Sequence, residues 1–250
     1  MARRPDLHAA VPAFSGVADE YERGRAGYPP EVVAALAEPL GIGPGTCVLD
    51  LAAGTGKLTR ALVETGANVV AVEPLDGMRA LLHGIDARAG TAEAIPLEDA
   101  SVDAVTVAQA FHWFDGERAL AEIHRVLRPG GGLGLVWNHG DTDVEWVERL
   151  DDLTLAVRWD DVPRARLGLW RKPFEATKLF TPLVERQLRH EVEADAESVR
   201  DRIASISFVA RLPEAEQAEI LRQVDAITAE LPERFPYPYV TFVYVCRRVP

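Results

Sequence analysis

Residues 46–62, which read TCVLDLAAGTGKLTRAL, constrain the fold more than any other part of the chain. A short apolar run typical of a buried strand leads into a turn of small residues at 52–56, and a helical pattern of apolar residues follows. Such a turn suits a nucleotide-like ligand, because backbone N–H groups at the start of the helix face the ligand and glycine allows its close approach. The segment therefore predicts an α/β fold with a ligand bound at this turn.

The acid and the glycines of this segment indicate which ligand the turn favours. Asp50 is followed by Gly54 and Gly56, and Thr59 occupies the position of the third glycine in a dinucleotide-binding turn. The spacing Asp-x-x-x-Gly-x-Gly resembles the first motif of the class I S-adenosylmethionine-dependent methyltransferases. That cofactor carries an amino-acid tail and no phosphate, so an acid beside the turn is favourable. The alternative is a generic doubly wound turn without a ligand.

Composition excludes several classes of function. The 250 residues are 48% hydrophobic and 26% charged, which is typical of one globular domain. A net charge of −12 argues against a protein that holds long nucleic acid by its phosphates. Cys47 and Cys246 lack metal-ligand spacing, and neither a signal region nor an apolar run of about 18 residues occurs. We expect a reduced, cytoplasmic protein without a metal site or membrane span, and the oligomeric state stays open.

A second strand at 68–72 leads directly into Glu73 and Pro74. Glu73 lies seventeen residues after Gly56, where a carboxylate that only accepts hydrogen bonds can take both hydroxyls of a ribose. A short helix predicted at 75–83 turns Met78 toward an adenine, with core filling as the alternative. A loop at 90–96 follows a weak third strand at 86–89, and it frames the adenine edge with Glu93.

Apolar strands and helices alternate through the middle of the chain. Strands are predicted at 102–108 and 133–137, with a helix at 118–127 between them. This rhythm indicates a parallel, doubly wound sheet. The stretches VLDLAAGTGKLT, VVAVEP, GTAEAIPL, VDAVTVAQAFHWFD and LRPGGGLGLVWN are similar to the successive class I methyltransferase motifs and span about 46–138. The main departure is Ala52-Ala53, where the family usually has at least one glycine.

The resemblance implies a doubly wound, mostly parallel, seven-stranded Rossmann-like sheet with a helical insertion or lid over its carboxyl edge. It also implies S-adenosyl-L-methionine as cofactor and a small-molecule acceptor, as in the subgroup that includes aconitate-type carboxyl and some thiol methyltransferases. We expect a single domain at 1–250, divided into an N-terminal lid (1–40), a cofactor-binding core (41–138), an insertion (139–180) and C-terminal strands and helices (181–250). The expected cofactor-binding residues are Asp50, Ala52, Gly54, Gly56, Glu73, Pro74, Met78, Ala92, Glu93 and Gln109.

The second half of the chain is less informative. Helices are predicted at 141–158, 196–207 and 214–231, and strands at 183–193 and 239–248. Arginines at 164, 166 and 171 suit an acidic acceptor, with a solvated loop face as the alternative. Ahead of the helix at 31–40 lies a cluster of Tyr21, Arg23, Arg25 and Tyr28, which forms either a solvated arm or a lid over the cofactor.

His112 is the candidate general base, because it follows the fourth strand at the edge where ligands lie in such sheets. A structural histidine is the alternative, and the neighbouring aromatic residues either wall a pocket or fill the core. The expected substrate-binding residues are Tyr21, Tyr28, His112, Trp113, Trp137, Asn138 and Trp170.

Three functions therefore compete. The first is methyl transfer by in-line displacement to a carboxylate, thiol or hydroxyl of a small molecule, and a carboxylate needs no base, whereas a hydroxyl does. The second is an S-adenosylmethionine-binding protein with non-methylating activity such as cyclisation. The third is a nicotinamide-dependent oxidoreductase, which Thr59 disfavours.

Overall fold

The computed structural model describes residues 18–157, 165 and 168–250, so Arg164 and Arg166 lie outside it. Its strands are β1 (Cys47–Leu51), β2 (Asn68–Val72), β3 (Asp86–Arg88), β4 (Val102–Ala108), β5 (Leu127–Gly140), β6 (Val184–Ala194) and β7 (Phe235–Arg247). Its helices are α1 (Ala18–Gly24), α2 (Pro30–Leu40), α3 (Lys57–Glu64), α4 (Asp76–Arg79), α5 (Gly116–Val126), α6 (Glu145–Ala156), α7 (Lys172–Ala176), α8 (Ala196–Ala204), α9 (Ser207–Ala210) and α10 (Glu214–Thr228), with 3-10 turns η2 (Phe111–Trp113) and η4 (Leu169–Arg171).

Within these residues the strands form one seven-stranded sheet in the order β3-β2-β1-β4-β5-β7-β6. Neighbouring strands from β3 to β5 are parallel, whereas β7 runs antiparallel to both β5 and β6. The predicted doubly wound, mostly parallel sheet is therefore confirmed. The strand order reverses between β1 and β4, and such a reversal opens a crevice at the carboxyl ends of the strands.

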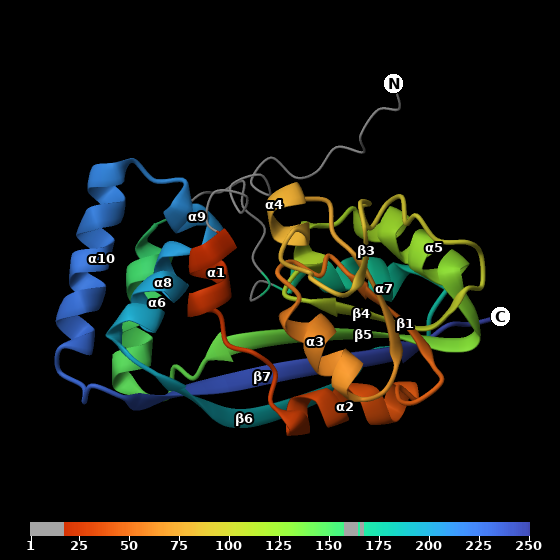
Figure 1. Ribbon diagram of the computed structural model, residues 1–250, viewed down its shortest axis with the longest axis horizontal. Coiled ribbons are helices and arrows are strands. Elements are labelled where there is room, and N and C mark those ends of the chain that lie inside the picture. The colour runs from red at the N-terminus through yellow and green to blue at the C-terminus, as the bar shows by residue number, and fades with distance from the viewer. Residues whose placement is uncertain (1–17, 158–164, 166–167) are drawn as a thin grey trace.

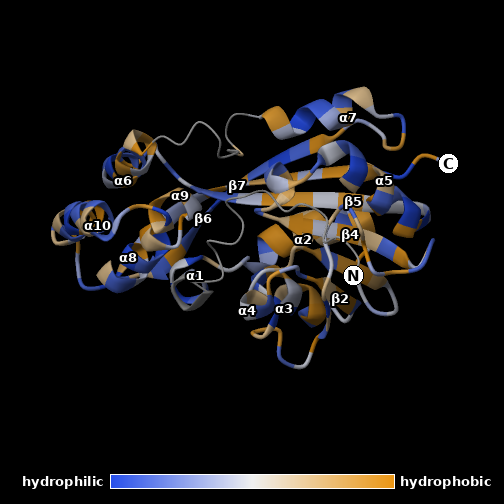
Figure 2. Ribbon diagram, turned by 90° about the horizontal axis from the view of Figure 1, so that it is seen from above, coloured by the Kyte–Doolittle hydropathy of each residue, from blue (hydrophilic) through white to orange (hydrophobic). Residues whose placement is uncertain are grey.

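Helices cover both faces of the parallel strands (Figure 1). Val48 packs with apolar residues of α2 and α3, whereas Leu49 belongs to the core on the opposite face, with α5. Both side chains are fully buried, as expected for parallel strands covered on each side. Figure 2 shows apolar colours gathered along α2 and the central strands. None of the helices in the described part is long and apolar enough to cross a membrane.

A separate group of helices lies beyond the carboxyl edge of the sheet, and we call α1, α6, α8, α9 and α10 the helical cap (Figure 1). The connection from β6 to β7 carries α8 to α10, and it leaves the sheet after Ala194 of β6, which pairs with Phe235 of β7. The cap has its own apolar core, which includes Leu150, Ile203 and Val224.

The predicted insertion at 139–180 therefore contributes only part of this cap. Its helix α6 packs on α10, but η4 and α7 pack beside η2 and α5 on a face of the sheet. Most of the cap comes from α8 to α10, within the segment predicted as C-terminal strands and helices.

Several element boundaries also differ from the sequence prediction. The helix predicted at 75–83 is regular only over α4, since tight turns replace it after Arg79. The last strand begins at Phe235 and includes Pro236 and Pro238. Both prolines lie beyond the last residue pair between β7 and β5, so β7 pairs only with β6 there. The N–H groups that proline lacks are therefore not needed for hydrogen bonds to β5.

Candidate functional site

The turn between β1 and α3 uses left-handed backbone conformations. The φ angles of Ala52, Gly54 and Gly56 are 55°, 58° and 89°. A Cβ atom added at Gly54 would meet no atom within 4 Å, whereas one at Gly56 would lie 2.4 Å from Cδ2 of Leu82. Gly54 thus leaves open space beside the turn. Gly56, which has no side chain, allows Leu82 after α4 to pack against the turn. Ala52 adopts its left-handed φ without glycine, at a cost of about 1 kcal/mol.

Glu73, directly after β2, connects this turn to the next one. Its Oε2 accepts a hydrogen bond from the N–H of Gly54 and its Oε1 accepts one from the N–H of Leu75, both at 2.9 Å. Burial raises the pKa of Glu73, and the two backbone donors oppose that shift. Each oxygen has a second lone pair, so the carboxylate can accept two further hydrogen bonds from a ligand.

Asp50 lies beneath the turn. Its side chain is fully buried and accepts hydrogen bonds from the hydroxyls of Thr59 (2.6 Å) and Thr106 (3.0 Å). Burial raises the pKa of Asp50 from 3.8 to about 6, although both threonines favour the ionised form. Asp50 is not among the described residues that line the adjacent cavities, and its hydrogen bonds to Thr59 and Thr106 connect β1 to α3 and β4 beneath the turn.

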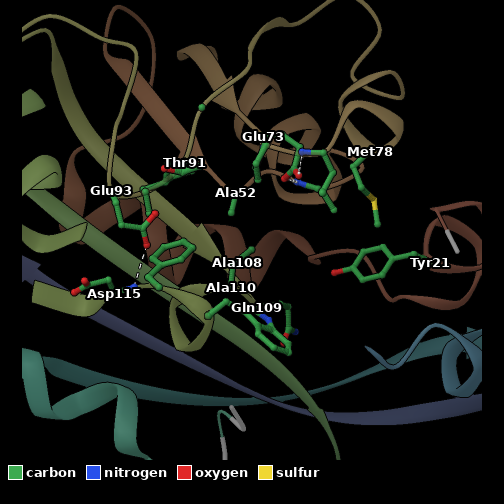
Figure 3. A pocket seen from close by; sticks show the side chains of 18 residues that line it. Tyr21, Ala52, Glu73, Met78, Thr91, Glu93, Ala108, Gln109, Ala110 and Asp115 are labelled. Atoms are coloured by element: carbon green, nitrogen blue, oxygen red, sulfur yellow. Dashed lines mark hydrogen bonds between the residues drawn. The ribbon is translucent and has the colours of Figure 1, made fainter. Parts of the chain in front are cut away.

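A cavity of about 130 Å³ opens at the carboxyl ends of β1, β2 and β4. Figure 3 shows Glu73 and Met78 on one side of it, with Thr91 and Glu93 on another. Its lining includes most of the predicted cofactor-binding residues, namely Ala52, Gly54, Glu73, Pro74, Met78, Ala92, Glu93 and Gln109. Asp50 and Gly56 lie outside the lining.

Thr91 is a lining residue that sequence reasoning missed. Its hydroxyl is buried and has no hydrogen-bond partner among the described residues, so it is available to a ligand. Glu93 nearby has a structural contact as well, since its Oε1 accepts from the N–H of Asp115 at 3.0 Å. The loop after β3 is thereby joined to the start of α5.

A second cavity of about 260 Å³ lies between the end of β5 and the helical cap. It shares Tyr21, Gln109 and Trp113 with the first cavity, so the two adjoin. The predicted substrate-binding residues His112, Trp137 and Asn138 also line it. We call it the acceptor cavity.

A smaller cavity of about 40 Å³ beside the glycine turn brings Tyr28 together with Arg25 and Lys57. Burial raises the pKa of Tyr28 well above its usual value, and the side chain of Gln109 opposes that shift. Gln109 has a left-handed φ of 57°, and it lines all three cavities. A strained residue at the junction of cavities is typical of a functional site.

The contact of His112 with Trp137 restricts its chemistry. Nε1 of Trp137 lies 3.3 Å from Nδ1 of His112. An indole can only donate, so the neutral imidazole carries its hydrogen on Nε2. In this form His112 donates a hydrogen bond at Nε2 rather than accepting a proton there.

Trp170 does not line the acceptor cavity. It is 7% exposed and packs on Trp137, with ring centroids 4.4 Å apart, inside the core on the α5 face. The basic residue beside it, Arg171, bonds to Glu185 and Tyr244 instead of facing the acceptor cavity. Trp170 and Arg171 instead line a separate cavity of about 510 Å³, together with Trp137 and Tyr244, so their predicted contact with an acceptor stays a prediction.

Comparisons with known proteins agree with this geometry. A family model described as a methyltransferase domain matches residues 49–135. An uncharacterized methyltransferase of Mycobacterium tuberculosis is 42% identical over 249 residues, covering 94% of each chain. The structure of a putative type II methyltransferase from Anaeromyxobacter dehalogenans has a TM-score of 0.62 at 27% identity, over 89% of this chain and 96% of that one. A Haemonchus contortus phosphoethanolamine N-methyltransferase in complex with S-adenosylhomocysteine shares the fold, with a TM-score of 0.53 at 15% identity over 97% of this chain and 58% of that one.

Proposed function

The chain belongs to the class I S-adenosylmethionine-dependent methyltransferases, and we propose that it methylates a small molecule held in the acceptor cavity. S-adenosylmethionine, when bound, supplies a methyl group activated by a positively charged sulfonium. The observation that carries the proposal is the Glu73 carboxylate, which bridges two turns at a cavity and has lone pairs to spare for a ribose diol.

The other residues of the cavities fit this cofactor. Thr91 offers an unused hydroxyl beside the predicted adenine-binding residues, and Gly54 leaves space for close approach. Arg25 and Lys57, which line the small cavity, supply cations for the carboxylate of the amino-acid tail. The buried carboxylates of Asp50 and Glu73 favour a cationic ligand and disfavour a pyrophosphate, which argues against a nicotinamide dinucleotide.

The protein's contribution to the reaction is binding, orientation and exclusion of water. Holding two reactants in line can supply roughly 7–11 kcal/mol of the barrier reduction. The helical cap lines one side of the acceptor cavity, so it limits the access of water to the acceptor. His112, with its hydrogen on Nε2, orients an acceptor and leaves its proton in place, which favours an acceptor that ionises by itself.

Calorimetric titration with S-adenosylmethionine, S-adenosylhomocysteine and NAD tests the cofactor. We expect the first two to bind and NAD not to bind, and the opposite result would refute the proposal. A screen of small acids, thiols and phenols, with release of S-adenosylhomocysteine as readout, then tests turnover. Cofactor binding without any release would support the non-methylating alternative, and methylation of RNA or protein alone would contradict a small-molecule acceptor.

A further inference from the structure

Two arginine side chains meet where the acceptor cavity borders the small cavity beside the glycine turn. Arg25 directly follows α1, and Arg202 lies on α8. The two segments touch through their backbones, since a Cβ atom added at Gly24 would lie 2.1 Å from the backbone nitrogen of Arg202. Both arginines line the acceptor cavity as well as the small cavity.

The hydrogen-bond partners of these two arginines are neutral. Nε of Arg25 donates to the hydroxyl of Ser205, and Nε of Arg202 donates to that of Tyr239, both at 3.2 Å. The guanidinium of Arg202 also lies over the ring of Tyr237, at 5.1 Å from its centroid. Burial raises the pKa of Tyr237, so its hydroxyl is uncharged at neutral pH and cannot balance the guanidinium.

In the described part of the chain, no carboxylate lies within ion-pair distance, 4.0 Å, of Arg25 or Arg202. Their neighbours differ, because Arg23 pairs with Asp201 and Arg200 pairs with Asp225. Asp151 also lines the acceptor cavity and acts on Arg202 from a greater distance. Among the described residues that line these two cavities, Asp151 is the one acid beside the cations Arg25, Lys57 and Arg202, so their summed charge is positive.

The pKa shifts of the two guanidinium groups have opposite directions. Burial lowers the pKa of Arg25, and the charge of Arg202 lowers it further. Burial also opposes the charge of Arg202, but Tyr237, Tyr239 and Asp151 outweigh it and raise the pKa of Arg202, so this guanidinium stays charged and can bind an anion. The planar guanidinium group matches a carboxylate, which it can bind through two parallel hydrogen bonds.

In the proposed complex the cofactor tail supplies one carboxylate, and an acceptor that is an acid would supply a second. Arg25 shares the small cavity with Lys57, which suits the cofactor tail. Arg202 contacts Tyr237, and both face the acceptor cavity beside apolar residues. These apolar lining residues are Val147, Leu150, Leu155, Ile203, Ile206 and Phe208.

We propose that the acceptor is an apolar carboxylic acid, recognised through a carboxylate that Arg202 binds. This deepens the proposed function, on which it rests for the identity of the cavity. The apolar walls contact the body of the molecule, while the cation selects its charged end.

Matched pairs of an acid and its amide test this assignment, with hexanoate and hexanamide, and phenylacetate and phenylacetamide, as probes. Binding is measured by calorimetry with and without saturating S-adenosylhomocysteine. We expect at least one acid to bind and its amide to fail. Arg202→Gln should weaken binding of that acid by roughly 10- to 150-fold, the loss of charge-assisted hydrogen bonds, with the affinity for S-adenosylhomocysteine unchanged.

Arg200→Gln is the matched control, since Arg200 lies on the same helix and pairs with Asp225. It should change neither affinity. Arg202→Lys, which keeps the charge, should retain part of the acid binding, and circular dichroism verifies that each variant is folded.

Equal binding of acid and amide, no binding of either acid by the wild type, or full acid binding by Arg202→Gln would each overturn the proposal. Loss of S-adenosylhomocysteine affinity with acid binding intact would overturn it too, because Arg202 would then belong to the cofactor. A wild-type protein that binds an acid but not S-adenosylhomocysteine would refute the proposed function alone.

Discussion

Replacing Asp50 with asparagine should make the protein more stable at neutral pH. The raised pKa, from 3.8 to about 6, means that burial disfavours the charged carboxylate even with its two hydroxyl donors. At about 1.4 kcal/mol per factor of ten in proton affinity, the penalty is about 3 kcal/mol. An asparagine amide can accept from only one hydroxyl and must donate to the other, which costs about 1 kcal/mol. The expected net gain for Asp50→Asn is about 2 kcal/mol.

The difference in stability between Asp50→Asn and the wild type should depend on pH, and the direction follows from the raised pKa of Asp50. Because the folded-state pKa of Asp50 is raised, the folded wild type binds more protons than the unfolded chain between pH 3.8 and about 6. The penalty is thus complete above about pH 6, falls as the pH drops, and vanishes below the unfolded pKa. The advantage of Asp50→Asn should shrink over this window and reverse slightly near pH 4.

Urea denaturation of both proteins at several pH values between 4 and 7.5 measures the difference in free energy of unfolding. Asp103 provides a control for which the opposite change in stability is expected. Its pKa is lowered, because hydrogen bonds from the N–H of Cys47 and from Arg128 outweigh its desolvation. Asp103→Asn should therefore destabilise the protein at neutral pH. An Asp50→Asn variant that is less stable at pH 7.5, or a difference that does not vary with pH, would refute the reasoning.

Three further substitutions test the site. Gly56→Ala places a Cβ atom 2.4 Å from Leu82 at a left-handed φ, and we expect a loss of roughly 1–3 kcal/mol in thermal or urea unfolding; unchanged stability would contradict this. Glu73→Gln should weaken S-adenosylmethionine binding by roughly 1.5–3 kcal/mol in calorimetry, because one acceptor oxygen becomes a donor, and an unaltered dissociation constant would remove Glu73 from the ribose site. His112→Ala should leave the pH profile of turnover nearly unchanged, whereas a loss of about 10²–10⁴-fold with a missing acidic limb would mean that His112 is a base after all.

Sequence reasoning succeeded where the site is local in the chain. The glycine turn and Glu73 belong to adjacent strand ends, so their spacing alone predicts that they meet. The burial of Asp50 follows from the face on which it lies, because strand alternation places it with Val48 under α3. The prediction placed Asp50 at the strand end without assigning that face.

Contacts between distant segments could not be read in this way. Arg202 meets Tyr239, 37 positions later, and Arg25, 177 positions earlier, because α1 packs on α8. Nothing in the spacing of these residues indicates that contact. The packing of Trp170 on Trp137, 33 positions earlier, is likewise a contact that only the fold shows, and its role in binding stays a prediction.

The first cavity and the acceptor cavity are lined by different parts of the chain. Apart from Tyr21, the lining of the first cavity comes from a single run between Leu51 and Asp115, while the cap side of the acceptor cavity comes from α6, α8 and α9. Substitutions in the cap helices can therefore reshape the acceptor cavity without changing the lining of the first cavity. Among the described residues, only Tyr21, Gln109 and Trp113 line both cavities. A substitution at one of these three positions changes the walls of both cavities at once.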